Sequence, residues 1–168
     1  MKVYQLYRKQ FLPISPAEAW EFFSSPRNLG KITPERMNFV ILSQTGGEQM
    51  HEGQQIRYKV TVLPFIRVSW LTEIMEVNEP YQFTDVQRSG PYALWKHTHT
   101  FKAVNGGVEM TDEVSYALPL GPLGQLAHAL FVRREVNRIF DHRYRVLEDL
   151  FRQQSQRYQP SHFVHSSR

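Results

Sequence analysis

The chain has 168 residues, a length that suits one domain, and its 41% hydrophobic and 21% charged residues are typical of an ordinary globular protein. It contains no cysteine, which excludes a disulfide scaffold, a thiolate zinc site and a cysteine nucleophile. The net charge of +4 is a mild excess with no recognised nucleic-acid-binding motif beside it, so we expect no nucleic-acid partner.

The N-terminal segment predicts one strand followed by two short helices. Residues 3–11 are rich in the Tyr, Val, Leu and Phe that strands favour. Ser15 can cap a helix, Pro16 suits its first turn, and Glu18 completes a capping box. That helix ends within a Ser-Ser-Pro sequence, and residues 27–32 predict the second helix.

A run of strands occupies the middle of the chain. Alternating hydrophobicity and turn residues predict strands at 39–42, 54–62, 66–77, 81–88, 92–102 and 108–118. The last two strands form a hairpin around Asn105-Gly106, a pair that suits the positive φ angles of a type I′ turn.

One long helix is predicted to follow, over residues 122–151, about 40 Å in length. Its apolar stripe is expected to contain Leu123, Leu126, Leu130, Val136, Ile139, Phe140, Leu147 and Leu150. Its arginines predict a solvated basic face. We expect residues 1–151 to form a single ligand-binding domain and residues 152–168 to form a polar, flexible tail.

This order of elements predicts an α+β helix-grip fold. In such a fold, a curved antiparallel sheet of six or seven strands wraps around the long C-terminal helix, and two short helices lie between the first and second strands. Strands grouped together with segregated helices favour helices packed on one face of an antiparallel sheet.

Three sequence blocks resemble one protein superfamily. They are GPY at 90–92 with WKHTHTF at 95–101, MTDEVSYALPLG at 110–121, and IFDHR at 139–143. These blocks resemble a bacterial branch of the START and birch-pollen-allergen-like superfamily, also called SRPBCC. The resemblance implies the helix-grip fold and an internal cavity. It does not imply a particular reaction, because the superfamily includes lipid carriers, hormone receptors and polyketide aromatase/cyclases.

Strand alternation sorts the side chains of the last hairpin into two faces. The two-residue turn sets the cross-strand pairs of the inner face, which are Phe101 with Met110, His99 with Asp112, His97 with Val114, and Trp95 with Tyr116. The same alternation places Asp85 on the inner face of its own strand. Arg143 lies beside the apolar stripe of the long helix, so we expect it to point inward and pair with Asp112 or Asp85.

These polar residues allow three interpretations. They can form a structural network of ion pairs, they can bind the polar head of a mostly apolar ligand, or they can perform acid–base or metal-assisted chemistry. The expected ligand-binding residues are Tyr58, Trp70, Phe83, Trp95, His97, His99, Asp112, Val114, Tyr116, Phe140 and Arg143. The catalytic candidates, if the protein is an enzyme, are His97, His99, Asp112 and Asp85.

A metal site is the weaker form of the chemical interpretation. His97 and His99 lie two residues apart on one face, and with Asp112 opposite they resemble a two-histidine, one-carboxylate site. Because Trp95 and Phe101 crowd the same face, we expect no bound metal and no cofactor. The remaining histidines, at 51, 128, 142, 162 and 165, lack partners at ligand spacing and are expected to be solvated.

The leading functional prediction is a non-enzymatic protein that binds or transports a small hydrophobic or amphipathic ligand in an internal cavity. The first alternative is a polyketide aromatase/cyclase- or dehydratase-like enzyme. The second is an interaction module that docks an acidic partner through its basic helix. The first residues lack the apolar core of a signal peptide, and no segment has the roughly 18 apolar residues of a membrane span. We therefore expect a cytoplasmic protein with no membrane span, as a monomer or weak homodimer.

Overall fold

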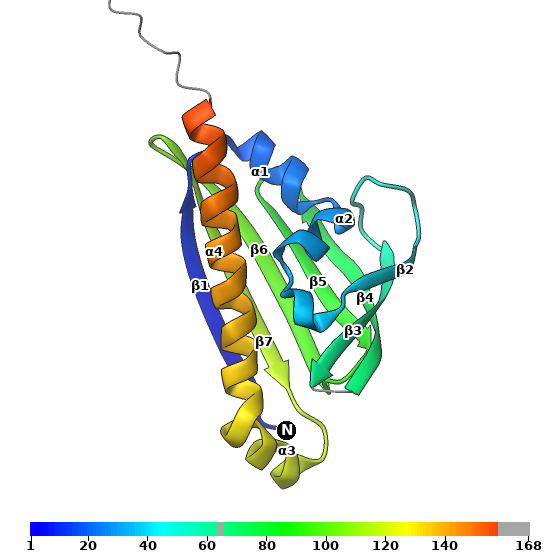
Figure 1. The fold of residues 1–168 in the computed structure, drawn as a ribbon. Coiled ribbons are helices and arrows are strands. Elements are labelled where there is room, and N and C mark those ends of the chain that lie inside the picture. The colour runs from blue at the N-terminus through cyan, green and yellow to red at the C-terminus, as the bar shows by residue number, and fades with distance from the viewer. Residues whose placement is uncertain (64–65, 158–168) are drawn as a thin grey trace, which may run out of the picture.

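The computed structural model, which describes residues 1–63 and 66–157, is an antiparallel sheet packed against one long helix (Figure 1). The strands are β1 (Tyr4–Leu12), β2 (Val40–Gln44), β3 (Gln55–Leu63), β4 (Ile66–Asn78), β5 (Gln82–Ser89), β6 (Leu94–Val104) and β7 (Gly107–Ala117). They form one seven-stranded sheet in the order β1-β7-β6-β5-β4-β3-β2. The predicted α+β helix-grip fold is confirmed.

Short helices connect the first two strands and lie over the concave side of the sheet (Figure 1). They are α1 (Pro16–Phe23), α2 (Pro26–Leu29), and the 3₁₀ turns η1 (Gly30–Ile32) and η2 (Glu35–Met37). The predicted capping box starts α1: the Ser15 hydroxyl accepts from the Glu18 amide, and the Glu18 carboxylate accepts from the Ser15 amide. The cap fixes α1 where Trp20 and Phe23 pack against Phe101 of β6.

The register of the last hairpin is as predicted. Phe101 pairs with Met110, His99 with Asp112, His97 with Val114, and Trp95 with Tyr116. The predicted type I′ turn is wrong, because Gly106 has a positive φ of 80° and Asn105 does not. A two-residue turn that requires a positive φ only at its second central residue also connects two adjacent antiparallel strands. The register of the hairpin is therefore the same for both types of turn.

The C-terminal helix differs from the prediction in its first part. It consists of α3 (Gly121–Ala127), a π-helical turn η3 (His128–Val132) and α4 (Arg133–Arg157). In the π turn each hydrogen bond spans one more residue than in an α-helix, so side chains before it are rotated away from the stripe that follows. Leu123, Leu126 and Leu130 are accordingly 68%, 57% and 68% exposed, while Val136, Phe140 and Leu147 are buried.

The end of the helix and one residue of its stripe also differ from the prediction. Leu150 is exposed. The helix continues to Arg157 instead of ending at residue 151, so the first part of the predicted tail is helical. Residues 158–168 of that tail lie outside the described residues.

Candidate functional site

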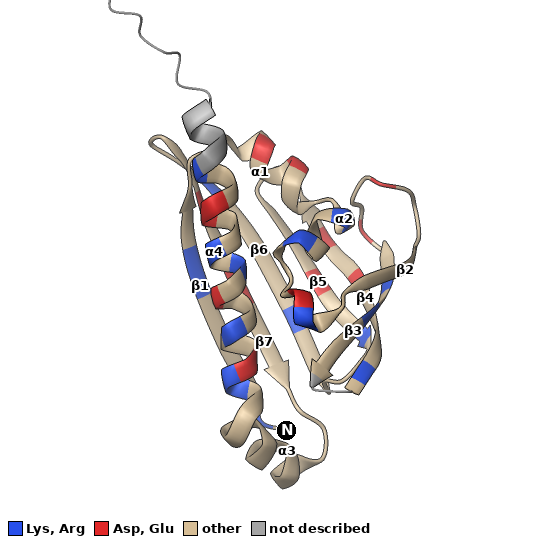
Figure 2. Cartoon of the chain, viewed as in Figure 1, with Lys and Arg blue, Asp and Glu red and all other residues tan. Residues whose placement is uncertain are grey.

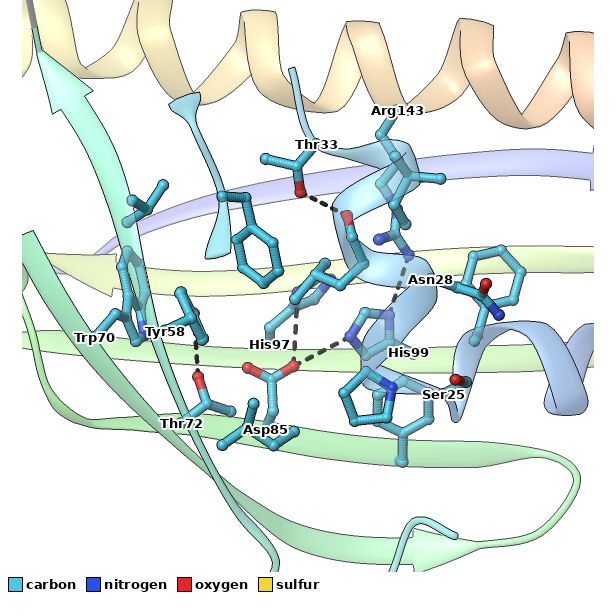
Figure 3. Close-up of a pocket in the computed structure, with 18 of the residues that line it drawn as sticks. Ser25, Asn28, Thr33, Tyr58, Trp70, Thr72, Asp85, His97, His99 and Arg143 are labelled. Carbon is cyan, nitrogen blue, oxygen red and sulfur yellow. Dashed lines mark hydrogen bonds and ion pairs between the residues drawn. The ribbon is translucent and has the colours of Figure 1, made fainter. Parts of the chain in front are cut away.

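A cavity of about 180 Å³ lies between the sheet and the helices. Strands β3 to β6 supply one wall, and the segment from α1 to β2 together with α4 supplies the other (Figure 3). Most of the lining is apolar, and its aromatic members are Phe22, Phe23, Phe39, Tyr58, Trp70, Phe83, Trp95 and Phe140.

The structure brings most of the predicted ligand-binding residues to this cavity. Those that line it are Tyr58, Trp70, Phe83, Trp95, His97, His99, Phe140 and Arg143, and the catalytic candidate Asp85 lines it too. Asp112, Val114 and Tyr116 do not line it, which corrects the prediction for these three. Val114 and Tyr116 pack against Val136 and Phe140, because α4 covers that part of β7.

The prediction missed part of the lining, most of it from the short helices and from β3 and β4. These residues include Asn28, Leu29, Ile32, Thr33, Met37 and Met50, together with Ile56, Val60, Thr72, Ile74 and Ile139. Ile56 and Val60 share the inner face of β3 with Tyr58, so strand alternation gave a signal for them. The short helices gave none, because a single turn has no periodicity that indicates which side faces the sheet.

Asp112 is the centre of a buried polar network. Its Oδ1 lies 2.9 Å from His97 Nε2 and 3.0 Å from His99 Nδ1. Arg143 donates to both of its oxygens, from Nε and Nη2, each over 3.1 Å. The predictions that His99 contacts Asp112 and that Arg143 points inward to pair with an inner-face acid are confirmed.

Asp85 lies on the side of this network that faces the cavity. Its Oδ2 lies 3.1 Å from His99 Nε2 and 3.8 Å from His97 Nδ1 (Figure 3). The two imidazoles therefore lie between the carboxylates of Asp85 and Asp112. His99 stacks on Phe83 with ring centroids 4.1 Å apart, and the Arg143 guanidinium lies 5.2 Å from the centre of the Phe23 ring. Aromatic rings thus fix the orientation of the polar groups.

The charges of the network follow from burial and from these contacts. Burial raises the pKa of Asp112, but the Arg143 guanidinium and the hydrogen bonds from His97 and His99 outweigh burial and hold that pKa well below its usual value. Burial lowers the pKa of His97, the neighbouring His99 lowers it further, and Asp112 opposes both. The network therefore contains an ionised Asp112 and a neutral His97.

The protonation state of His97 determines which hydrogen bonds its ring can make with a molecule in the cavity. Its Nε2 faces the ionised Asp112, which can only accept, so a neutral His97 carries its proton on Nε2. Nδ1 is then unprotonated, on the side of Asp85. A hydroxyl or amine in the cavity could donate to this nitrogen or to the Asp85 carboxylate.

The geometry changes the composition of the candidate metal site. The ligand atoms of Asp85, His97 and His99 lie within 4.8 Å of one another, whereas the predicted third ligand, Asp112, is bonded to Arg143. The guanidinium lies 3.3 Å from His99 Nδ1, and its positive charge opposes a cation at this place. That no metal is bound stays a prediction.

Replacing His97 with glutamine is expected to flatten the dependence of stability on pH below about pH 6.5. The folded pKa of His97 lies below its usual value of 6.5, so its contribution to stability is complete above that value and is lost as the pH falls. Each proton taken up only on unfolding changes the free energy of unfolding by about 1.4 kcal/mol per pH unit. Urea denaturation at several pH values measures this slope.

The exposed His51 provides the control for this measurement, since His51→Gln should keep the slope of the unchanged protein. A His97→Gln variant with that same slope would contradict the lowered pKa.

The other histidines of the described chain differ in burial. His51 is exposed and His142 is half-buried, but His128 is buried, which is a further error of the prediction. His128 stacks on Tyr4 with ring centroids 3.4 Å apart, and its Nε2 lies 2.9 Å from the Tyr116 hydroxyl. His162 and His165 lie outside the described residues.

No helix of the described chain combines the length and hydropathy needed to cross a bilayer.

No protein-family model matches this sequence, and no curated protein matches it. Solved structures do match. The Zhui aromatase/cyclase from Streptomyces sp. R1128 has a TM-score of 0.72 at 10% identity, over 92% of this chain and 96% of that one.

Two further solved structures show the same likeness. The protein TTHA0849 from Thermus thermophilus has a TM-score of 0.66 at 16% identity, over 90% of this chain and 99% of that one. Ara h 8.0201 has a TM-score of 0.63 at 14% identity, over 90% and 99%. At these identities the likeness concerns the fold.

Proposed function

We propose that this chain, which has the helix-grip fold of the START and birch-pollen-allergen-like superfamily, binds a small, mostly apolar molecule that carries a polar group. The observation that carries the proposal is the cavity, because it combines apolar walls with one cluster of polar side chains. Ligand pockets are usually built in this way, with the few polar groups fixing the orientation of the ligand.

The size of the cavity limits the ligand. An apolar cavity of about 150 Å³ holds a benzene molecule. A cavity of about 180 Å³ therefore accommodates a ligand with one or two rings, or an aliphatic molecule of similar volume.

The charges around the cavity limit the polar group of the ligand. The positive charge of Arg143 is balanced by Asp112, to which it donates two hydrogen bonds. Within this network, the groups left toward the cavity are the Asp85 carboxylate and the unprotonated Nδ1 of His97, which both accept. We therefore expect a ligand whose polar end donates hydrogen bonds, such as a phenol, an alcohol or an amine.

Acid–base catalysis on such a molecule is the second candidate function. The observation that favours it is the place of His97 between Asp112 and Asp85, a carboxylate that lines the cavity. Burial lowers the pKa of His97, which favours the neutral imidazole that a base needs. A base of this kind can take a proton from a bound substrate, and Asp112 stabilises the positive charge that the imidazole then carries. The Zhui aromatase/cyclase has the same fold, so this fold is compatible with the cyclisation of a bound substrate.

The predicted interaction module, which would dock an acidic partner through its basic helix, has less support. Acidic residues lie among the arginines of α4 (Figure 2). Asp141 pairs with Arg8, and Glu148 pairs with Arg152 four residues later. The exposed side of α4 is therefore of mixed charge.

Native mass spectrometry of the protein from the organism that encodes it tests the proposal. We expect a mass increase of one small molecule per chain, and the same molecule bound to a His97→Gln variant. A bound molecule in that variant that differs from the one in the unchanged protein, for example by one water, would identify an enzyme instead. Protein that is bare from its host and takes up no small aromatic alcohol in solution would contradict both functions.

A further inference from the structure

The end of the molecule formed by α3 and η3 carries an apolar surface that faces solvent. We call it the leucine face, and it consists of Leu120, Leu123, Leu126, Leu130 and Phe131, all exposed. Leu123, Leu126 and Leu130 recur at the spacing i, i+3, i+7, which places them on one side of the helical segment. An exposed apolar patch of this kind on a folded protein indicates a surface that another body covers.

The packing of α3 holds the leucine face outward. The inner side of the segment is occupied by Gly124, where an added Cβ would lie 2.1 Å from the Pro119 carbonyl oxygen. His128 also lies on this inner side, where its ring stacks on Tyr4 and is hydrogen-bonded to the Tyr116 hydroxyl. A rotation that buried the leucines would break these contacts, so their exposure belongs to the folded state.

The leucine face is followed at the start of α4 by Arg133 and Arg134, whereas the adjacent Glu135 is paired with Arg36 and Arg138. Residues 114–132 contain no Asp, Glu, Lys or Arg, and Figure 2 shows α3 free of either charge. Lys2, Arg133 and Arg134 flank this segment, and none of the three makes an ion pair with a carboxylate within residues 1–63 and 66–157. Lys2 and Arg133 also line an open groove of about 660 Å³ between β1 and η3, whose lining contains no acidic residue.

We propose that the leucine face docks onto a lipid bilayer that contains anionic phospholipids. The leucines would enter the boundary between headgroups and acyl chains, and Lys2, Arg133 and Arg134 would meet the headgroup phosphates. Figure 1 shows α3 at the end of the molecule away from α1, so a flat surface can approach it. The proposal is independent of the ligand in the cavity.

A second copy of the chain is a poorer occupant of the same face. In a two-fold dimer each patch meets its own copy. The cations that flank the leucine face would then lie opposite like charges, which disfavours association. An anionic bilayer complements both the apolar surface and the charge.

Flotation of the full chain with vesicles tests the proposal. We expect binding to vesicles of phosphatidylcholine with phosphatidylglycerol, and much less to phosphatidylcholine alone. The variant Leu123→Gln/Leu126→Gln/Leu130→Gln should lose more than about tenfold in partitioning, since three apolar side chains no longer enter the lipid. The variant Arg133→Gln/Arg134→Gln should lose about 30-fold on the anionic vesicles, since each cation near the surface contributes to the binding.

Two matched control variants test whether exposed apolar or basic side chains elsewhere on the protein contribute to vesicle binding. Leu42→Gln/Ile66→Gln/Met75→Gln removes three exposed apolar side chains elsewhere, and Arg138→Gln/Arg145→Gln removes two exposed arginines of α4. Both controls should bind as the unchanged protein does, and circular dichroism should show all variants folded.

Three outcomes would overturn the proposal: no binding to either vesicle, equal losses in variants and controls, or a dimer in light scattering that the leucine variant converts to a monomer.

Discussion

Replacing Arg143 with alanine is expected to lower the free energy of unfolding by about 3–5 kcal/mol. The guanidinium is buried and donates to both oxygens of Asp112 over 3.1 Å. Its removal leaves the Asp112 carboxylate buried without its cation, and the loss of a buried partner is among the most destabilising changes in a folded protein. Urea denaturation followed by circular dichroism measures the change.

Two further variants identify the cause of that loss. Arg138→Ala removes an exposed arginine of the same helix and should change the free energy of unfolding by less than about 0.5 kcal/mol. The double variant Arg143→Met/Asp112→Leu should recover part of the stability lost in Arg143→Ala, because an apolar pair replaces both buried charges. A loss below about 0.5 kcal/mol in Arg143→Ala would show that the buried ion pair does not hold this helix to the sheet.

The last hairpin, formed by β6 and β7, could be predicted from the sequence because its determinants are local. A two-residue turn at Asn105-Gly106 and the alternation of side chains fix the register, and the register sets His99 opposite Asp112. The inward position of Arg143 followed in the same way from helical spacing, which places it between Phe140 and Leu147.

Other features depend on contacts that no local pattern contains. The π turn η3 rotates α3 relative to α4, so leucines at the spacing of a core stripe face solvent instead. Their exposure follows in part from the stacking of His128 on Tyr4 of β1, a tertiary contact. Likewise, Asp112 has the strand position of a cavity residue but lies beneath Arg143 and the two histidines.

Filling the cavity with a new side chain is expected to abolish ligand binding. Val60 is buried on the inner face of β3 and lines the cavity, so Val60→Phe places a ring in the space that a ligand would occupy. Because the cavity is empty of protein atoms, it relieves much of the strain that a larger side chain causes in a packed core. We expect the variant to stay folded and its affinity for a one- or two-ring ligand to fall by at least about 100-fold.

Val40→Phe provides the matched control, because Val40 is an exposed residue of the neighbouring strand β2 and the same substitution there leaves the cavity unchanged. A variant at Val60 that bound as well as this control would show that the ligand occupies another place.

Calorimetric titration with 2-naphthol tests the binding cavity most directly, since this molecule has two rings and one hydroxyl donor. The cavity predicts saturable binding of one 2-naphthol per chain in the unchanged protein and in Val40→Phe, and no measurable binding in Val60→Phe. Absence of binding in the unchanged protein, or equal binding in all three proteins, would contradict a ligand site between the sheet and the helices.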